Sequence, residues 1–137
     1  MNIESSPTPR SDSADRPGST RDGWLVSNGQ VLASARLATD RASRRRGLLR
    51  SNAPGAPDTT EGALVLAPCR WVHTIGMRRA IEVAYLDGDG RVIKAVHMRP
   101  HRLGAPVPHA KVVVEAPQGA FSRWGLRVGD TVEVRTT

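Results

Sequence analysis

The fold class is decided by residues 81–97, which read IEVAYLDGDGRVIKAVH. Residues 81–86 form an apolar run that is too short for an ordinary helix and has the length of a buried strand. The sequence Asp87-Gly88-Asp89-Gly90 is typical of a turn, and residues 91–97 alternate with the two-residue period of a returning strand. The stretch therefore predicts a β-hairpin.

The same signals recur on both sides of this hairpin. Short strands are predicted at residues 24–26, 31–37, 62–67, 110–116 and 131–135, and Asn28-Gly29 predicts a tight hairpin turn. Two short helices are predicted, one over residues 40–49 and one that Pro117 opens and Gly125 closes. Because no strand–helix–strand rhythm is present, the pattern predicts a mainly β fold, a compact antiparallel sandwich or barrel with two short helices.

The composition predicts one folded domain. Residues 1–22 are rich in Ser, Pro, Asp and Arg and nearly free of large apolar residues, which predicts a disordered tail before a single β-domain at residues 23–137. The chain has one cysteine and thus no internal disulfide, and it has no apolar run long enough to span a membrane. With no apolar export segment near its start, we expect a cytoplasmic monomer that does not contact membranes.

The net charge of +7 raises the question of a nucleic-acid partner. Of the 20 basic residues, 18 are Arg, a bias that indicates skewed genome composition rather than a binding surface. The arginines of the predicted basic helix are Arg41, Arg44, Arg45, Arg46 and Arg50. No aromatic residue is interleaved with them to stack on bases, so nucleic-acid binding through this helix is kept only as an alternative.

The candidate functional residues lie within ten positions of one another: Cys69, His73, Met77 and Arg78. A guanidinium at the mouth of a β fold can bind a carboxylate or phosphate with two parallel hydrogen bonds. We therefore expect a cleft, lined by these four side chains, that binds a small ligand or a protein partner. No cofactor and no metal is predicted.

Two other interpretations of this segment stay open. Cys69 could be a nucleophile with His73 as its base, which would make the protein an enzyme. The spacing of four between Cys69, His73 and Met77 would also suit a soft metal on a helix. Pro68, Gly76 and the β-branched residues between them argue against a helix, however, and Cys69 and Met77 are equally typical of core packing.

Several blocks of sequence, taken in order, carry a family resemblance. They read LATDR at 37–41, RGLL at 46–49, HTIGMR at 73–78, YLDGDGRV at 85–92, VEAPQG at 114–119 and GLRVGD at 125–130. Over about residues 31–134 the chain resembles the family known as domain of unknown function 192 (DUF192). The resemblance implies a compact, mainly antiparallel β fold of jelly-roll-like character with short helices, and no established activity. The central block resembles a His-Thr-Phe-Gly-Met-Arg variant, from which Ile75 departs.

Overall fold

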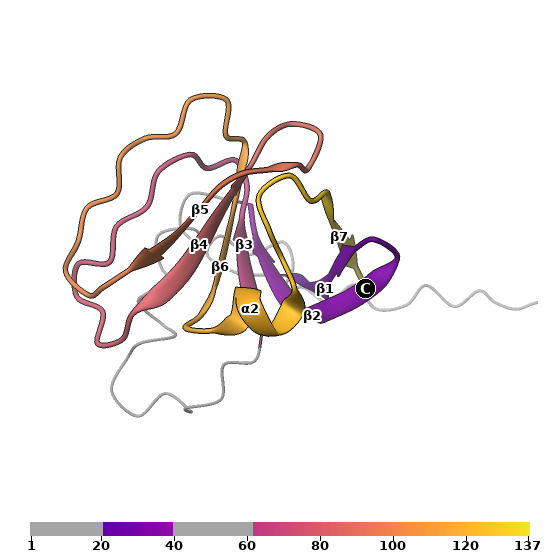
Figure 1. Cartoon of the computed structure of the whole chain (residues 1–137), viewed down its shortest axis with the longest axis horizontal. Coiled ribbons are helices and arrows are strands. Elements are labelled where there is room, and N and C mark those ends of the chain that lie inside the picture. The colour runs from indigo at the N-terminus through magenta and orange to yellow at the C-terminus, as the bar shows by residue number, and fades with distance from the viewer. Residues whose placement is uncertain (1–20, 40–61) are drawn as a thin grey trace, which may run out of the picture.

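The computed structural model describes residues 21–39 and 62–137, in which seven strands form one sheet and one short helix packs against it (Figure 1). The strands are β1 (Arg21–Ser27), β2 (Gln30–Ala38), β3 (Ala63–Leu66), β4 (Ile81–Leu86), β5 (Val92–Met98), β6 (Val112–Pro117) and β7 (Val132–Thr136), and the helix is α2 (Ala120–Trp124). The mainly β prediction is confirmed. Residues 1–20, the predicted helix at 40–49 and the arginines at 41–50 lie outside the described residues.

The strand order is β5-β4-β6-β3-β2-β1-β7, and five of the six neighbouring pairs are antiparallel. The turn predicted at Asn28-Gly29 is present, with φ angles of 53° and 76° that match its hairpin type. The β2–β3 pair is parallel, which the sequence prediction of an antiparallel sheet did not include. The long chain segment between these two strands allows this, because a parallel pair needs a crossover connection of about a dozen residues or more.

The sheet curls until its two edge strands meet at one end. The N–H of Val92, at the start of β5, donates to the carbonyl of Asp130 over 2.8 Å. The N–H of Val132, at the start of β7, donates to the carbonyl of Gly90 over 2.8 Å. The protein is therefore one curled sheet closed at one end, closer to the barrel than to the two-sheet sandwich among the expected architectures.

Both faces of the central strands are buried. Along β4, Ala84 and Leu86 belong to one apolar cluster, whereas Val83 and Tyr85 belong to a second cluster on the opposite face. The first cluster includes α2, and the second lies beneath the connections between the strands. Burial on two faces explains why the sequences of β3 and β4 are almost continuously apolar.

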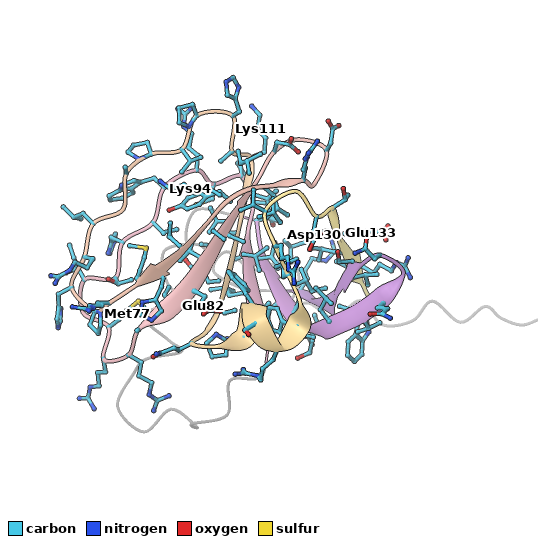
Figure 2. The ribbon with its side chains drawn as sticks, in the orientation of Figure 1. Met77, Glu82, Lys94, Lys111, Asp130 and Glu133 are labelled. Carbon is cyan, nitrogen blue, oxygen red and sulfur yellow. The ribbon has the colours of Figure 1, made fainter. Side chains whose placement is uncertain are left out.

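Helix α2 is shorter than predicted because Pro117 belongs to β6 and does not open the helix. The predicted stop at Gly125 is confirmed, since this residue has a left-handed φ of 68°. At the other end, Glu82 of β4 accepts a hydrogen bond from the Phe121 N–H over 2.8 Å, and Figure 2 shows Glu82 beside α2. A carboxylate from the sheet thus holds the first turn of the helix in place.

Candidate functional site

Two loops lie side by side over the second apolar cluster (Figure 1). The first loop, residues 67–80, joins β3 to β4, and the second loop, residues 99–111, joins β5 to β6. Backbone hydrogen bonds connect them: Thr74 N to Arg102 O at 2.8 Å, Gly104 N to Val72 O at 3.0 Å and Val107 N to Arg70 O at 3.0 Å. Segments about 30 residues apart in sequence therefore form one connected layer on the sheet.

Thr74 lies at the centre of this layer and has no exposed surface. Its hydroxyl donates to the Arg99 carbonyl over 2.6 Å and accepts from the Arg102 N–H over 2.8 Å. Its carbonyl accepts from the N–H groups of Met77 and His101. One buried side chain thus satisfies backbone groups of the second loop that would otherwise be unpaired.

The first loop is extended at its centre, so that its side chains alternate between inside and outside. Val72 and Thr74 are buried, whereas Trp71 and Ile75 are 41% and 50% exposed and His73 is half-buried. The Trp71 ring packs against the His73 ring with centroids 5.6 Å apart. His73 forms a β-bridge with Leu103 of the second loop, and the Leu103 side chain is 67% exposed.

These contacts form one surface, which we call the two-loop face and define by Trp71, His73, Ile75, His101 and Leu103. His101 belongs to it because its Nδ1 accepts a hydrogen bond from the N–H of Gly76 over 3.3 Å, next to Ile75. The indole N–H of Trp71 donates to the carbonyl of Gly104, which fixes the ring against the second loop. Three large apolar side chains, those of Trp71, Ile75 and Leu103, are thus exposed on two loops that are hydrogen-bonded to each other.

The charge of the two loops is uniformly positive. They contain six cationic residues and no Asp or Glu: Arg70, Arg78, Arg79, Arg99, Arg102 and Lys111, all of them exposed. In Figure 2 the acidic side chains Asp130 and Glu133 lie at the far end of the view from Met77 of the first loop, whereas Glu82 of β4 lies nearer to Met77. The two-loop face therefore combines exposed apolar groups with an unbalanced positive charge.

The four side chains predicted to line a cleft occupy three different environments. Met77 is only 1% exposed and packs in the second apolar cluster, where it offers no surface to a ligand. Cys69 is half-buried against the same cluster, His73 is half-buried on the two-loop face, and Arg78 is exposed. Of the four, His73 and Arg78 have polar groups near solvent on the first loop.

The alternatives of a Cys69 nucleophile and of a metal site depend on what Cys69 and His73 contact. The Cys69 thiol donates to the Trp71 carbonyl over 3.2 Å, and His73 Nδ1 accepts from the Ile75 N–H over 3.2 Å. That nitrogen is therefore already engaged by a backbone N–H and is not open to accept a proton from the thiol in this arrangement. Within residues 21–39 and 62–137, no three His, Cys, Asp or Glu side chains gather as a metal-ligand group.

Glu115 is a residue of interest that the sequence analysis did not identify. It lies in β6 between Leu64 of β3 and Val83 of β4, and it is only 2% exposed. Neither of its carboxyl oxygens has a hydrogen-bond partner. Burial raises the pKa of Glu115 well above its ordinary value of 4.5, so this carboxyl is held in its protonated form where exposed carboxyls are charged.

Tyr85 lies on the same face of the sheet, two residues along β4 from Val83. Its pKa is raised from 10.0, first by burial and then by the nearby acidic groups of Cys69 and Glu115. The face beneath the two loops therefore disfavours negative charge, in contrast to the cationic surface above it.

The two loops are packed tightly at Gly104. A Cβ added there would lie 2.8 Å from the carbonyl oxygen of Val72, which is shorter than any ordinary contact. We expect Gly104→Ala to push the loops apart and to lower the free energy of unfolding by about 1–3 kcal/mol. The matched control is Gly88→Ala, whose added Cβ would meet no atom closer than 3.9 Å. Urea denaturation of both variants checks this, and equal stabilities would contradict it.

A family profile described as "Uncharacterized ACR, COG1430", which is DUF192, matches residues 24–134. The chain belongs to the DUF192 family. The resemblance expected from the sequence is confirmed, and DUF192 carries no assigned activity. In the part of the DUF192 chain that is described, no helix combines the length and apolar character needed to cross a membrane.

Individual relatives of this DUF192 protein agree with the assignment. UPF0127 proteins of Pyrococcus furiosus and Pyrococcus abyssi are each 36% identical over 62 residues, which are 45% of this chain and 53% of each relative. The match thus spans about half the length of these curated relatives.

Two solved structures share the fold of this DUF192 chain. A protein of unknown function from Novosphingobium aromaticivorans has a TM-score of 0.64 and 17% identity, covering 83% of this chain and 84% of its own. A Sinorhizobium meliloti protein described as a candidate transcription regulator has a TM-score of 0.62 and 19% identity, covering 87% and 96%. At these identities the likeness shows the fold alone.

Proposed function

We propose that this DUF192 domain is a non-enzymatic binding module that holds an acidic segment of a partner protein on the two-loop face. The observation that carries the proposal is the exposure of Trp71, Ile75 and Leu103 on two paired loops that contain six cations and no carboxylate. Exposed apolar side chains within a polar rim are typical of surfaces that bind proteins.

The kind of side chain favours a protein over a nucleic acid. Ile75 and Leu103 are aliphatic and the more exposed of the three, and aliphatic groups do not stack on bases. Trp71 is fixed by its contacts with His73 and Gly104, so only part of its ring is open to a partner. A peptide that combines aliphatic residues with Asp and Glu would match both the apolar groups and the charge.

The hydrogen bonds beneath the face support binding by a preformed surface. The two loops are joined through Thr74 and through the backbone of residues on either side of it. A surface that is already ordered loses little conformational entropy when a partner docks. The buried Met77 serves this role by anchoring the first loop to the apolar cluster below it.

The proposal is tested with a fluorescent peptide of alternating Leu and Glu residues, titrated against the wild-type protein. We expect Ile75→Ser and Leu103→Ser each to weaken binding about tenfold, since one buried aliphatic side chain contributes about 1.5 kcal/mol or more. The matched control is Val128→Ser, which changes an equally exposed valine outside the two loops. Affinity should also fall as salt is added, because the arginines attract the peptide through screened charges.

Two results would overturn the proposal. The first is an absence of binding by the acidic peptide and by a panel of acidic sequences of different spacing. The second is tighter binding of a single-stranded oligonucleotide than of any acidic peptide, with Ile75→Ser and Leu103→Ser leaving that binding unchanged. That outcome would assign the positive charge to a nucleic-acid partner instead.

We also propose that the protein acts as a monomer in the cytoplasm. The single cysteine of the sequence cannot form a disulfide within the chain, and a chain without internal disulfides is compatible with a reducing compartment. Cell fractionation and sedimentation equilibrium check the two parts of this statement.

A further inference from the structure

We propose that His73 and His101 form a paired donor site for an oxyanion, a carboxylate or phosphate group on a side chain of the partner. The proposal rests on the proposed function and names the group that the two-loop face recognises. It starts from the contacts of two consecutive backbone N–H groups. The N–H of Ile75 donates to His73 Nδ1 over 3.2 Å, and the N–H of Gly76 donates to His101 Nδ1 over 3.3 Å.

These contacts determine which ring nitrogen carries the proton. A backbone N–H can only donate, so each Nδ1 must accept and must be unprotonated in this arrangement. A neutral imidazole has one donor and one acceptor, so the proton of each ring lies on Nε2. Both rings therefore present an N–H donor on the side opposite to the turn formed by Ile75 and Gly76.

Both rings are also fixed in position. The backbone N–H of His101 donates to the Thr74 carbonyl over 2.8 Å, and its φ of 61° lies in the left-handed region that few non-glycine residues adopt. His73 is held by its β-bridge to Leu103 and by the ring of Trp71. The two donors are thus placed by the same contacts that order the face.

The charged groups of both loops favour an anion at this position. From the first loop these are Arg70, Arg78 and Arg79, and from the second loop Arg99, Arg102 and Lys111, with His109 also on the second loop. No carboxylate belongs to either loop. N–H donors on loops whose charged groups are all cationic favour the binding of carboxylates and phosphates. The outward nitrogens are unsuited to a metal cation, because a protonated Nε2 has no lone pair to donate.

Substituting Asn for each histidine removes the Nε2 donors and keeps an acceptor for the backbone N–H groups of the turn. Asn is shorter than His, but its side-chain oxygen occupies nearly the place of Nδ1 and can accept the same backbone N–H. The His73→Asn/His101→Asn double variant therefore keeps the acceptors and loses both Nε2 donors. Hydrogen exchange of the Ile75 and Gly76 amides reports whether the turn is kept in this variant.

The experiment compares three peptides that differ at one position, which carries Glu, phosphoserine or the neutral isostere Gln. We expect the wild-type protein to bind the Glu or phosphoserine peptide about tenfold more tightly than the Gln peptide, as expected for charge-assisted hydrogen bonds. In the double variant this preference should fall to about threefold or less, because the arginines alone remain. His97→Asn, on the exposed outer strand β5, is the control and should keep the full preference.

The outcomes separate this inference from the function on which it rests. If the double variant loses more affinity for the phosphoserine peptide than for the Glu peptide, the site is assigned to phosphate. If it loses as much or more affinity for the Glu peptide, the site is assigned to carboxylate. If the double variant keeps the wild-type preference while its turn amides stay protected, the paired donor site is wrong and the binding module stands. If no acidic peptide binds the wild-type protein, the proposed function itself is wrong.

Discussion

The Glu115→Gln variant is expected to be more stable than the wild-type protein at pH 8 and close to it in stability at pH 5. Burial without a hydrogen-bond partner raises the pKa of the Glu115 carboxyl well above 4.5. Above that pH the unfolded chain has lost a proton that the folded protein still holds. Wild-type stability therefore falls by about 1.4 kcal/mol per pH unit until the folded pKa is reached, and Gln removes this dependence.

Urea denaturation at pH 5, 6, 7 and 8 measures the effect. Tyr85 does not interfere, because its pKa is raised from 10.0 and its titration lies above this range. Glu133→Gln is the control, because Glu133 is exposed on β7. The stability of this variant should change with pH in the same way as that of the wild-type protein. Parallel curves for wild type and Glu115→Gln would show that Glu115 is not protonated in the folded protein.

A second substitution at this position tests the cost of the buried polar atoms themselves. Glu115→Leu replaces both unpaired oxygens with apolar atoms between the apolar side chains Leu64 and Val83. We expect it to raise the free energy of unfolding by about 1–3 kcal/mol even at pH 5, where the ionisation effect is below about 1 kcal/mol. A carboxylic acid kept in such a position at a cost in stability is typical of a functional residue.

Most of the sheet could be predicted because its signals are local. The hairpin at residues 81–97 is present as β4 and β5, and the turn at Asn28-Gly29 is present as predicted. The β2–β3 pairing could not be predicted, because local patterns do not specify the path of the long segment between these strands. Pro117 was misassigned for a related reason, since a proline is compatible both with a first helical turn and with the end of a strand.

The four predicted site residues were grouped because they cluster within ten positions of the sequence. In the structure His73 lies on the two-loop face and Arg78 is exposed, whereas Met77 is in the core. The backbone is extended through residues 71–74, where the side-chain period is two, so Trp71 and His73 point away from the buried Val72 and Thr74. Ile75 follows in the turn that the Met77 N–H closes on the Thr74 carbonyl. The β-branched residues of this segment already argued against a helix and were the signal for that period. Leu103 and His101 could not be found from the sequence, because their proximity depends on pairing between two distant loops.

The sequence around Glu115 already contains an indication that this residue is unusual. It stands within the run Val112-Val113-Val114-Glu115-Ala116, where a charged residue interrupts an otherwise apolar strand. An exposed edge strand would tolerate such a residue, whereas a central strand buried on both faces would not. Glu115 is buried because β6 lies between β4 and β3 in the sheet, and this position is not evident from the local sequence.

Thr74→Val is expected to lower the free energy of unfolding by at least about 2 kcal/mol, although valine nearly matches threonine in shape. Without the hydroxyl, the Arg102 N–H loses its 2.8 Å acceptor and the Arg99 carbonyl loses its 2.6 Å donor. Each buried backbone group left unpaired costs about 1–3 kcal/mol. Thr74→Ser keeps the hydroxyl and loses one methyl group, so it should cost about 1 kcal/mol.

The same pair of variants separates global stability from the order of the two-loop face. Thr74 joins the loops at the level of His101 and Arg102, so its hydroxyl is expected to control how often the second loop opens. In Thr74→Val we expect faster hydrogen exchange at the amides of His101, Arg102 and Gly104, and weaker binding of the acidic peptide. Thr74→Ser should retain both properties. Equal exchange rates in the two variants would show that apolar packing beneath the loops, rather than this hydroxyl, holds the face together.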